Sequence, residues 1–127
     1  MQQEQKSFIR GRLKAITYSL KGIKILITSE DSIKAQCIIG LFATILGFVF
    51  KINATEWMLQ FLVIGLVLVA ESLNTAIEKV ADFIHPDYHK KIGVIKDVGA
   101  GAAGIAAIIS IILGCIIYIP KIAVLFS

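Results

Sequence analysis

The sequence predicts an all-α membrane protein, with an N-terminal amphipathic surface helix followed by three transmembrane helices. Two observations support this fold class. Of the 127 residues, 57% are hydrophobic and only 17% are charged, and the mean hydropathy is +0.82, which is too apolar for a soluble domain of this length. The apolar residues also gather in three runs separated by polar segments. We therefore expect a single membrane domain over residues 1–127.

The surface helix is expected within residues 6–33. Its large apolar side chains recur at helical spacing, namely Phe8, Ile16, Leu20, Ile23 and Ile27. Most of the basic residues of this segment lie on other faces, as expected for a helix that lies on an anionic membrane surface. A simple anchor that fixes the topology would have the same pattern.

The three transmembrane helices are expected at about residues 35–50, 57–84 and 98–119. Each must be helical because lipid offers no partner for backbone polar groups. The second run is apolar up to Ala70 except for Gln60, and no helix breaker follows before Pro86. Pro120 is expected to end the third helix.

Basic residues indicate the orientation of these helices. Seven lysines and arginines lie within residues 1–34 and four more within residues 79–97, whereas the link over residues 51–56 holds one lysine. The positive-inside rule then places the N-terminus in the cytoplasm and the C-terminus outside. Because the basic residues flank apolar spans, we expect the partner to be a phospholipid bilayer and not a nucleic acid.

Polar side chains interrupt the second span in a regular pattern. Glu71, Asn74, Glu78, Asp82 and His85 fall within about 80° of arc on a helix of 100° per residue. We call these five residues the acidic stripe. A carboxylate near hydrocarbon costs roughly 2.5 kcal/mol or more, so a cation, a basic partner or protonation must compensate for it.

Carboxylate oxygens are the ligands that Mg²⁺ prefers, and a site of this kind leaves positions for phosphate and water. The alternative is that the stripe consists of interfacial residues that reach water, which is most plausible for Asp82 and His85. Lys96 and Asp97, at the mouth of the third span, suggest a phosphate-neutralising lysine and a helix N-cap. The glycine-rich "GAGAAG" at residues 99–104 follows no strand, so it predicts close helix packing and not a dinucleotide site.

The run from Glu71 through Asn74-Thr75-Ala76-Ile77-Glu78 to Asp82 resembles the defining stretch of the bacterial integral-membrane diacylglycerol kinases and their undecaprenol kinase relatives. "YHKKIGVIKDVGAGAA" continues the resemblance over residues 88–103. The similarity covers roughly residues 8–121. It implies a multi-pass protein of the bacterial inner membrane, a homotrimer with active sites shared between subunits, and transfer of the γ-phosphoryl of Mg-ATP to a lipid hydroxyl.

The resemblance also implies roles for individual residues. Glu71 resembles the general base and Asn74 a second catalytic residue, while Glu30 and Glu78 resemble the pair that holds Mg²⁺. Glu71 and Lys14 match positions at the lipid substrate. The positions that match ATP contacts are Arg10, Tyr18, Glu30, Glu78, Asp87, Tyr88, His89, Lys96 and Asp97. Arg12 is an alternative to Arg10, because one residue is inserted before Lys14.

The lipid is less well defined. Diacylglycerol, giving phosphatidic acid, is the leading expectation because the family as a whole carries that activity. However, "EDSIKAQ" at residues 30–36 departs from the enteric diacylglycerol kinases, and "HPDYH" and "IYIPK" look more like the undecaprenol kinases. Undecaprenol, giving undecaprenyl phosphate, is therefore the alternative. From other classes, a small ion-coupled transporter or channel, or a non-catalytic assembly partner, would also be compatible with an acidic stripe.

Overall fold

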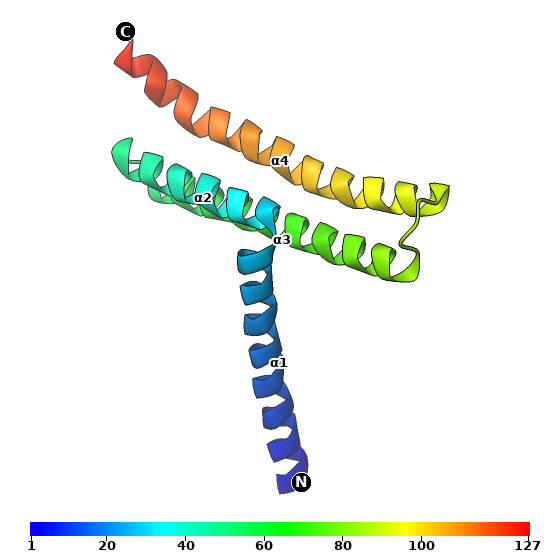
Figure 1. Cartoon of the computed structure of the whole chain (residues 1–127). Helices are drawn as coiled ribbons and strands as arrows, with labels where there is room; N and C mark the ends of the chain where they lie inside the picture. Colours follow the sequence, from blue (N-terminus) through cyan, green and yellow to red (C-terminus); the bar gives the residue numbers. More distant parts are fainter. The chain divides into compact units, whose positions relative to one another are not determined.

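The computed structural model describes all residues from Met1 to Ser127, and they form four helices and no strand (Figure 1). In chain order these are α1 (Gln2–Ser29), α2 (Asp31–Val49), α3 (Ala54–Ile84) and α4 (Lys90–Leu125). The contacts divide the chain into two compact units, residues 1–34 and residues 35–127. The all-helical prediction is confirmed.

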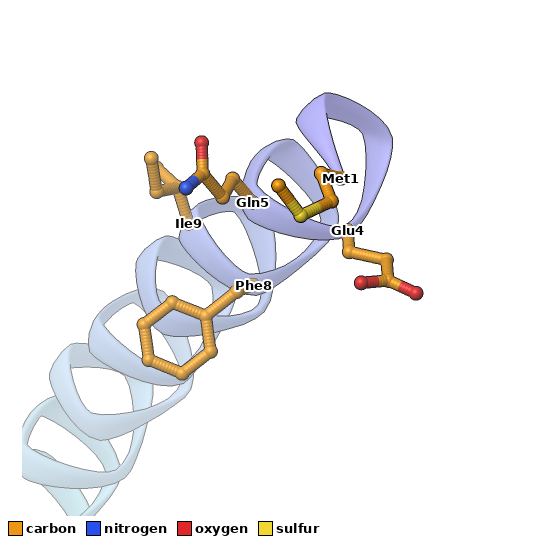
Figure 2. Close-up of a pocket in the computed structure, with 5 residues that line it drawn as sticks. All are labelled: Met1, Glu4, Gln5, Phe8 and Ile9. Carbon is orange, nitrogen blue, oxygen red and sulfur yellow. The ribbon is translucent and has the colours of Figure 1, made fainter.

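Helix α1 has no buried residue. Figure 2 shows a surface hollow at its start, lined by Met1, Glu4, Gln5, Phe8 and Ile9. Four of these residues belong to α1 and Met1 is its N-cap, so the hollow has no second wall and is not an enclosed site. The helix ends at Ser29, because Glu30 adopts an extended conformation (φ −108°, ψ 112°). It therefore stops short of the predicted residue 33.

Helices α2, α3 and α4 are each long and apolar enough to cross a membrane, and an 18-residue stretch of each has a mean hydropathy of 1.8, 1.7 and 2.6 respectively. Their large apolar side chains point outward: Phe48, Leu62 and Ile111 are among the many that are exposed. Such a surface is stable only against lipid or against other apolar helices. The prediction of three membrane-spanning helices is thus supported by length, composition and the direction of the side chains.

Helices α3 and α4 pack side by side and run antiparallel (Figure 1). Small residues of α4 allow the close approach, since Gly99, Ala103 and Ala106 are buried. Helix α2 packs on α3 through its own glycines. A Cβ added to Gly40 would lie 3.2 Å from Ile64, and one added to Gly47 would lie 2.6 Å from the Trp57 ring.

Helix α4 differs from the prediction at both ends. It begins at Lys90, and its N-cap is His89, whose Nδ1 accepts a hydrogen bond from the Lys91 backbone N–H (3.1 Å). Its other end lies at Leu125, so Pro120 is inside the helix and the prediction that it ends the helix is wrong. Continuing the helix past Pro120 brings the Lys121 ammonium to Glu56 of α3, an ion pair that a helix ending before Pro120 would not position.

Helix α3 begins slightly earlier than predicted. Asn53 and Glu56 form a capping box: the Asn53 side chain accepts from the Glu56 backbone N–H (2.9 Å), and the Glu56 carboxylate accepts from the Asn53 N–H (3.0 Å). These bonds satisfy two backbone donors that would otherwise lack partners at the helix start. The helix ends at Ile84, two residues before Pro86, as the sequence predicts.

Candidate active site

The acidic stripe lies on the half of α3 that leads into the connection to α4. Glu71, Asn74 and His85 are half-buried, whereas Glu78 and Asp82 are exposed. The Asn74 side chain donates a hydrogen bond from Nδ2 to Glu78 Oε1 (3.3 Å). The structure therefore brings together Asn74 and Glu78 of the predicted stripe. It leaves the carboxylates of Glu78 and Asp82 exposed, where a ligand can reach them.

Asn74 is held between its own helix and α4. Its carbonyl oxygen Oδ1 is buried and has no hydrogen-bond partner. This atom points at Gly99 of α4, where an added Cβ would lie only 2.5 Å away. A buried carbonyl without a donor is costly, and most buried polar groups in proteins do have a hydrogen-bond partner.

Asp82 and Lys96 join α3 to α4 farther along the stripe. The Lys96 ammonium donates to Asp82 Oδ1 at 2.5 Å, and the two side chains are 57% and 39% exposed for Asp82 and Lys96 respectively. An ion pair this open to solvent adds little stability. It does place the Lys96 ammonium beside the other residues of the stripe. A phosphate could bind this ammonium together with the Asp82 carboxylate or in its place.

The connection between α3 and α4 holds the next group of predicted residues. Asp87, Tyr88 and His89 are exposed. The His85 ring nitrogen Nδ1 lies 2.7 Å from the Asp87 backbone oxygen, and the His85 and His89 rings pack edge to face at 5.3 Å. The connection is thus an ordered segment next to the stripe, with aromatic and polar side chains available to a ligand.

Asp97 does not have its predicted position. It lies two turns inside α4 and is exposed, so the prediction that it caps this helix is wrong. The helix starts earlier because His89 supplies the capping acceptor for Lys91. Asp97 therefore does not cap α4, and it presents an exposed carboxylate directly after Lys96 in the sequence.

The predicted residues of α1 are all exposed. Glu30, the C-cap of this helix, is half-buried, and its backbone N–H donates to Leu26 O (3.2 Å). Arg10 and Lys14 line one hollow of α1 together, and Tyr18 follows at the same spacing of four residues. Arg12 lies about 160° away from this face. The helix therefore groups Arg10, and not Arg12, with Lys14 and Tyr18.

One polar group was missed by the sequence analysis. Gln60 of α3 is 3% exposed; it donates to the Ala43 backbone oxygen of α2 (3.0 Å) and accepts from the Tyr118 hydroxyl of α4. One turn away, the Lys121 ammonium pairs with the Glu56 carboxylate at 2.8 Å. We call Glu56, Gln60, Tyr118 and Lys121 the polar clamp. The signal available was Gln60, an isolated amide in an apolar run.

The donor set of the stripe fits magnesium. The chain contains no group of three His, Cys, Asp or Glu side chains that could hold a metal ion by themselves. Magnesium does not need one, because it is commonly bound through one or two carboxylates together with substrate phosphates and water. Glu78, exposed and fixed by a single amide donor, has the oxygens that such a site requires.

Comparison with known proteins shows the family of this chain. The sequence pattern of the prokaryotic diacylglycerol kinases matches residues 17–118, which include α2, α3 and most of α4. The chain belongs to this family. The undecaprenol kinase of Bacillus subtilis (strain 168) is 34% identical over 108 residues, covering 85% of this chain and 88% of that protein.

Other relatives of this kinase are named for a different lipid. The diacylglycerol kinase of Escherichia coli (strain K12) is 33% identical over 105 residues, covering 83% of this chain and 86% of that protein. That of Haemophilus influenzae is 31% identical over 102 residues. The chain is therefore a membrane lipid kinase that uses ATP, and the transporter, channel and assembly-partner hypotheses are set aside. Identities of 34% and 33% do not separate the two lipids.

Proposed function

We propose that this kinase transfers the γ-phosphoryl group of Mg-ATP to the hydroxyl of diacylglycerol, giving phosphatidic acid. The observation that carries the proposal is the acidic stripe itself. The half-buried Glu71 follows the apolar half of α3. The exposed Glu78 lies about two turns farther along the same helix and accepts a hydrogen bond from Asn74. One helix thereby offers a carboxylate near the lipid and another near water, as a reaction between a lipid and ATP requires.

In the proposed mechanism Glu71 accepts the proton of the lipid hydroxyl. The hydroxyl oxygen then bonds to the γ-phosphorus, the bond from that phosphorus to the β–γ bridging oxygen breaks, and ADP leaves. The protein needs to supply position and neutralising charge and little covalent help. A base at the boundary of the acyl region can reach a hydroxyl that never leaves the headgroup layer.

Glu78 is the proposed carboxylate for Mg²⁺, and the resemblance to the family adds Glu30 as the second. When bound, the ion would neutralise charge on the β- and γ-phosphates. Asn74 holds Glu78 by its amide donor, so that the carboxylate presents its remaining lone pairs in a fixed direction.

The nucleotide is proposed to meet residues around the start of α4. Lys96 carries the cation for phosphate, and the exposed Asp87, Tyr88, His89 and Asp97 lie in the connection before α4 or in its first turns. The resemblance adds Arg10 and Tyr18 of α1, and Glu30, which is the C-cap of that helix. The grouping of Arg10 with Lys14 and Tyr18 on one face supports Arg10 over Arg12, and Lys14 is proposed, with Glu71, for the lipid.

The assembly and orientation are part of the same proposal. A homotrimer with shared sites would cover some of the exposed apolar surface of the three long helices. The distribution of lysine and arginine supports a cytoplasmic N-terminus and an outer C-terminus in the bacterial inner membrane. In this orientation α1 lies on the cytoplasmic surface, and the acidic stripe and Lys96 face the compartment that holds ATP.

Undecaprenol is the second candidate acceptor. It is favoured by the segments His85–His89 and Ile117–Lys121, which look more like the undecaprenol kinases. Either alcohol presents a hydroxyl at the membrane surface, and the proposed chemistry is the same for both.

The test is direct competition between the two lipids. The purified protein is reconstituted in phospholipid vesicles that contain equal amounts of diacylglycerol and undecaprenol, and it is supplied with Mg²⁺ and γ-labelled ATP. We expect phosphatidic acid to carry most of the label. Label mainly in undecaprenyl phosphate would replace the proposed acceptor, and label in neither lipid would overturn the proposed function.

A further inference from the structure

Asn74 is confined by two neighbours that act on opposite ends of its amide. The Nδ2 group faces the Glu78 carboxylate on the same helix, at 3.3 Å. The Oδ1 atom is buried against α4 without a hydrogen-bond donor. An amide rotated by half a turn would direct its oxygen at the carboxylate, which repels it. Glu78 therefore fixes which end of the amide turns toward α4.

Gly99 is the residue that accommodates the other end. An added Cβ at this position would lie 2.5 Å from Asn74 Oδ1, a separation that real Cβ atoms essentially never show, and 3.5 Å from Ile77 Cγ2, which is an ordinary contact. The only severe conflict is with the amide oxygen. The hydrogen that Gly99 carries in place of a Cβ leaves this oxygen the space that it occupies, so Oδ1 stays buried without a donor.

Other glycines of α4 do not share this property. Added Cβ atoms at Gly101 and Gly104 would meet nothing within 4 Å. Alanine is the better helix former, so nothing within the chain prevents alanine at those two positions. At Gly99 the side chain of Asn74 does.

We infer that Gly99 is a positioning residue for the phosphoryl transfer: because it has no Cβ, the Asn74 amide can keep the orientation that presents Nδ2 to Glu78, and this orientation supports the metal affinity of that carboxylate. The inference rests on the proposed role of Glu78 in binding Mg²⁺. A Cβ at residue 99 must turn or displace the amide, and Glu78 then loses the donor that orients it.

The test measures metal binding without turnover. The full-length protein in vesicles, with a non-hydrolysable ATP analogue, is titrated with Mn²⁺ as a spin-active substitute for Mg²⁺, and free Mn²⁺ is measured by electron paramagnetic resonance. For Gly99→Ala we expect the dissociation constant of Mn²⁺ to rise about tenfold, the lower end of the effect of losing an outer-shell partner of a ligand. The matched control Gly101→Ala should bind Mn²⁺ as the wild type does. Equal binding by both variants would overturn the inference.

A second pair of variants covers the case in which Gly99→Ala does not fold. Removing the amide removes the conflict, so Asn74→Ala/Gly99→Ala should fold and should bind Mn²⁺ as Asn74→Ala does. If the double variant also fails to fold, or binds Mn²⁺ more weakly than Asn74→Ala, Gly99 acts through general helix packing and the inference is wrong. Glu78→Gln distinguishes a failure of the proposed metal role from a failure of this inference. If Glu78→Gln binds Mn²⁺ as the wild type does, both the metal role of Glu78 and the inference about Gly99 are wrong. If Glu78→Gln binds Mn²⁺ more weakly but Gly99→Ala does not, only the inference about Gly99 is wrong.

Discussion

The two polar groups of the three-helix unit differ in how completely their hydrogen bonds are made. In the polar clamp, Gln60 both donates and accepts, and Lys121 meets Glu56 with side chains only 26% and 18% exposed. In the acidic stripe, Glu78 is exposed and Asn74 Oδ1 has no partner. Polar groups satisfied within the chain hold helices together, whereas an exposed carboxylate such as that of Glu78 remains available to a ligand.

The position of each group along the helices agrees with this division. The clamp connects α2, α3 and α4, since Gln60 contacts both Ala43 and Tyr118. The stripe joins only α3 and α4, through the exposed pair of Asp82 and Lys96. Substitutions in the clamp should therefore change stability, and substitutions in the stripe should change the reaction.

The largest effect is expected for Glu71→Gln. This variant keeps the shape of the side chain and loses the proton acceptor, so phosphorylation should fall at least about a hundredfold, as is typical when a general base is removed. ATP binding, measured by equilibrium titration in vesicles, should be unchanged. A rate near that of the wild type would remove Glu71 from the role of base.

The next effect is expected for Glu78→Gln. Loss of a metal-binding carboxylate should lower the rate at moderate Mg²⁺ by about tenfold to a hundredfold, and raised Mg²⁺ should restore part of it. The measurement is the initial rate as a function of the Mg²⁺ concentration. A loss that does not respond to Mg²⁺ would contradict the assignment.

Tyr118→Phe should affect stability and leave the chemistry intact. It removes the hydroxyl that donates to Gln60 and keeps the ring that packs on Phe50 at 5.8 Å. The free energy of unfolding should fall by about 1 kcal/mol, the usual size for such a bond between membrane helices. Denaturation in mixed micelles measures this change. A large loss of turnover per folded molecule would mean that the clamp takes part in the reaction.

Asp82→Asn should have the smallest effect. Its partner Lys96 is partly exposed, so the ion pair contributes at most about 1 kcal/mol to stability. Freed from Asp82, Lys96 can still meet a phosphate, and we expect the KM for ATP to change by no more than about threefold. Lys96→Met is the matched control and should raise the KM for ATP much more. Equal effects of the two variants would argue that the ion pair, and not the lysine alone, forms the nucleotide site.

Much of the fold could be predicted from the sequence because lipid restricts the possibilities. The three apolar runs required helices, and the spacing of the stripe placed Asn74 and Glu78 on neighbouring turns, where they form a hydrogen bond. The ends of α4 were harder to predict. His89 competes with Asp97 as a cap, and the ion pair of Lys121 with Glu56 accompanies a helix that continues through Pro120.

The contacts between helices could not be predicted from local patterns. The partner of Gln60 lies 58 residues away in sequence, and the approach of Gly99 to Asn74 depends on the register of two antiparallel helices. The sequence marked both glycine and amide as unusual for their surroundings. Only the packed structure relates them to each other.

The most direct test is to follow the γ-phosphate of ATP into lipid. Vesicles containing diacylglycerol and the wild type, Glu56→Gln or Glu71→Gln are given ATP labelled either at the γ- or at the α-phosphorus, and the label in phosphatidic acid is counted. We expect label only from the γ position, in the wild type and in Glu56→Gln, and almost none in Glu71→Gln. Lipid labelled from the α position, or equal labelling by the two glutamate variants, would contradict the account.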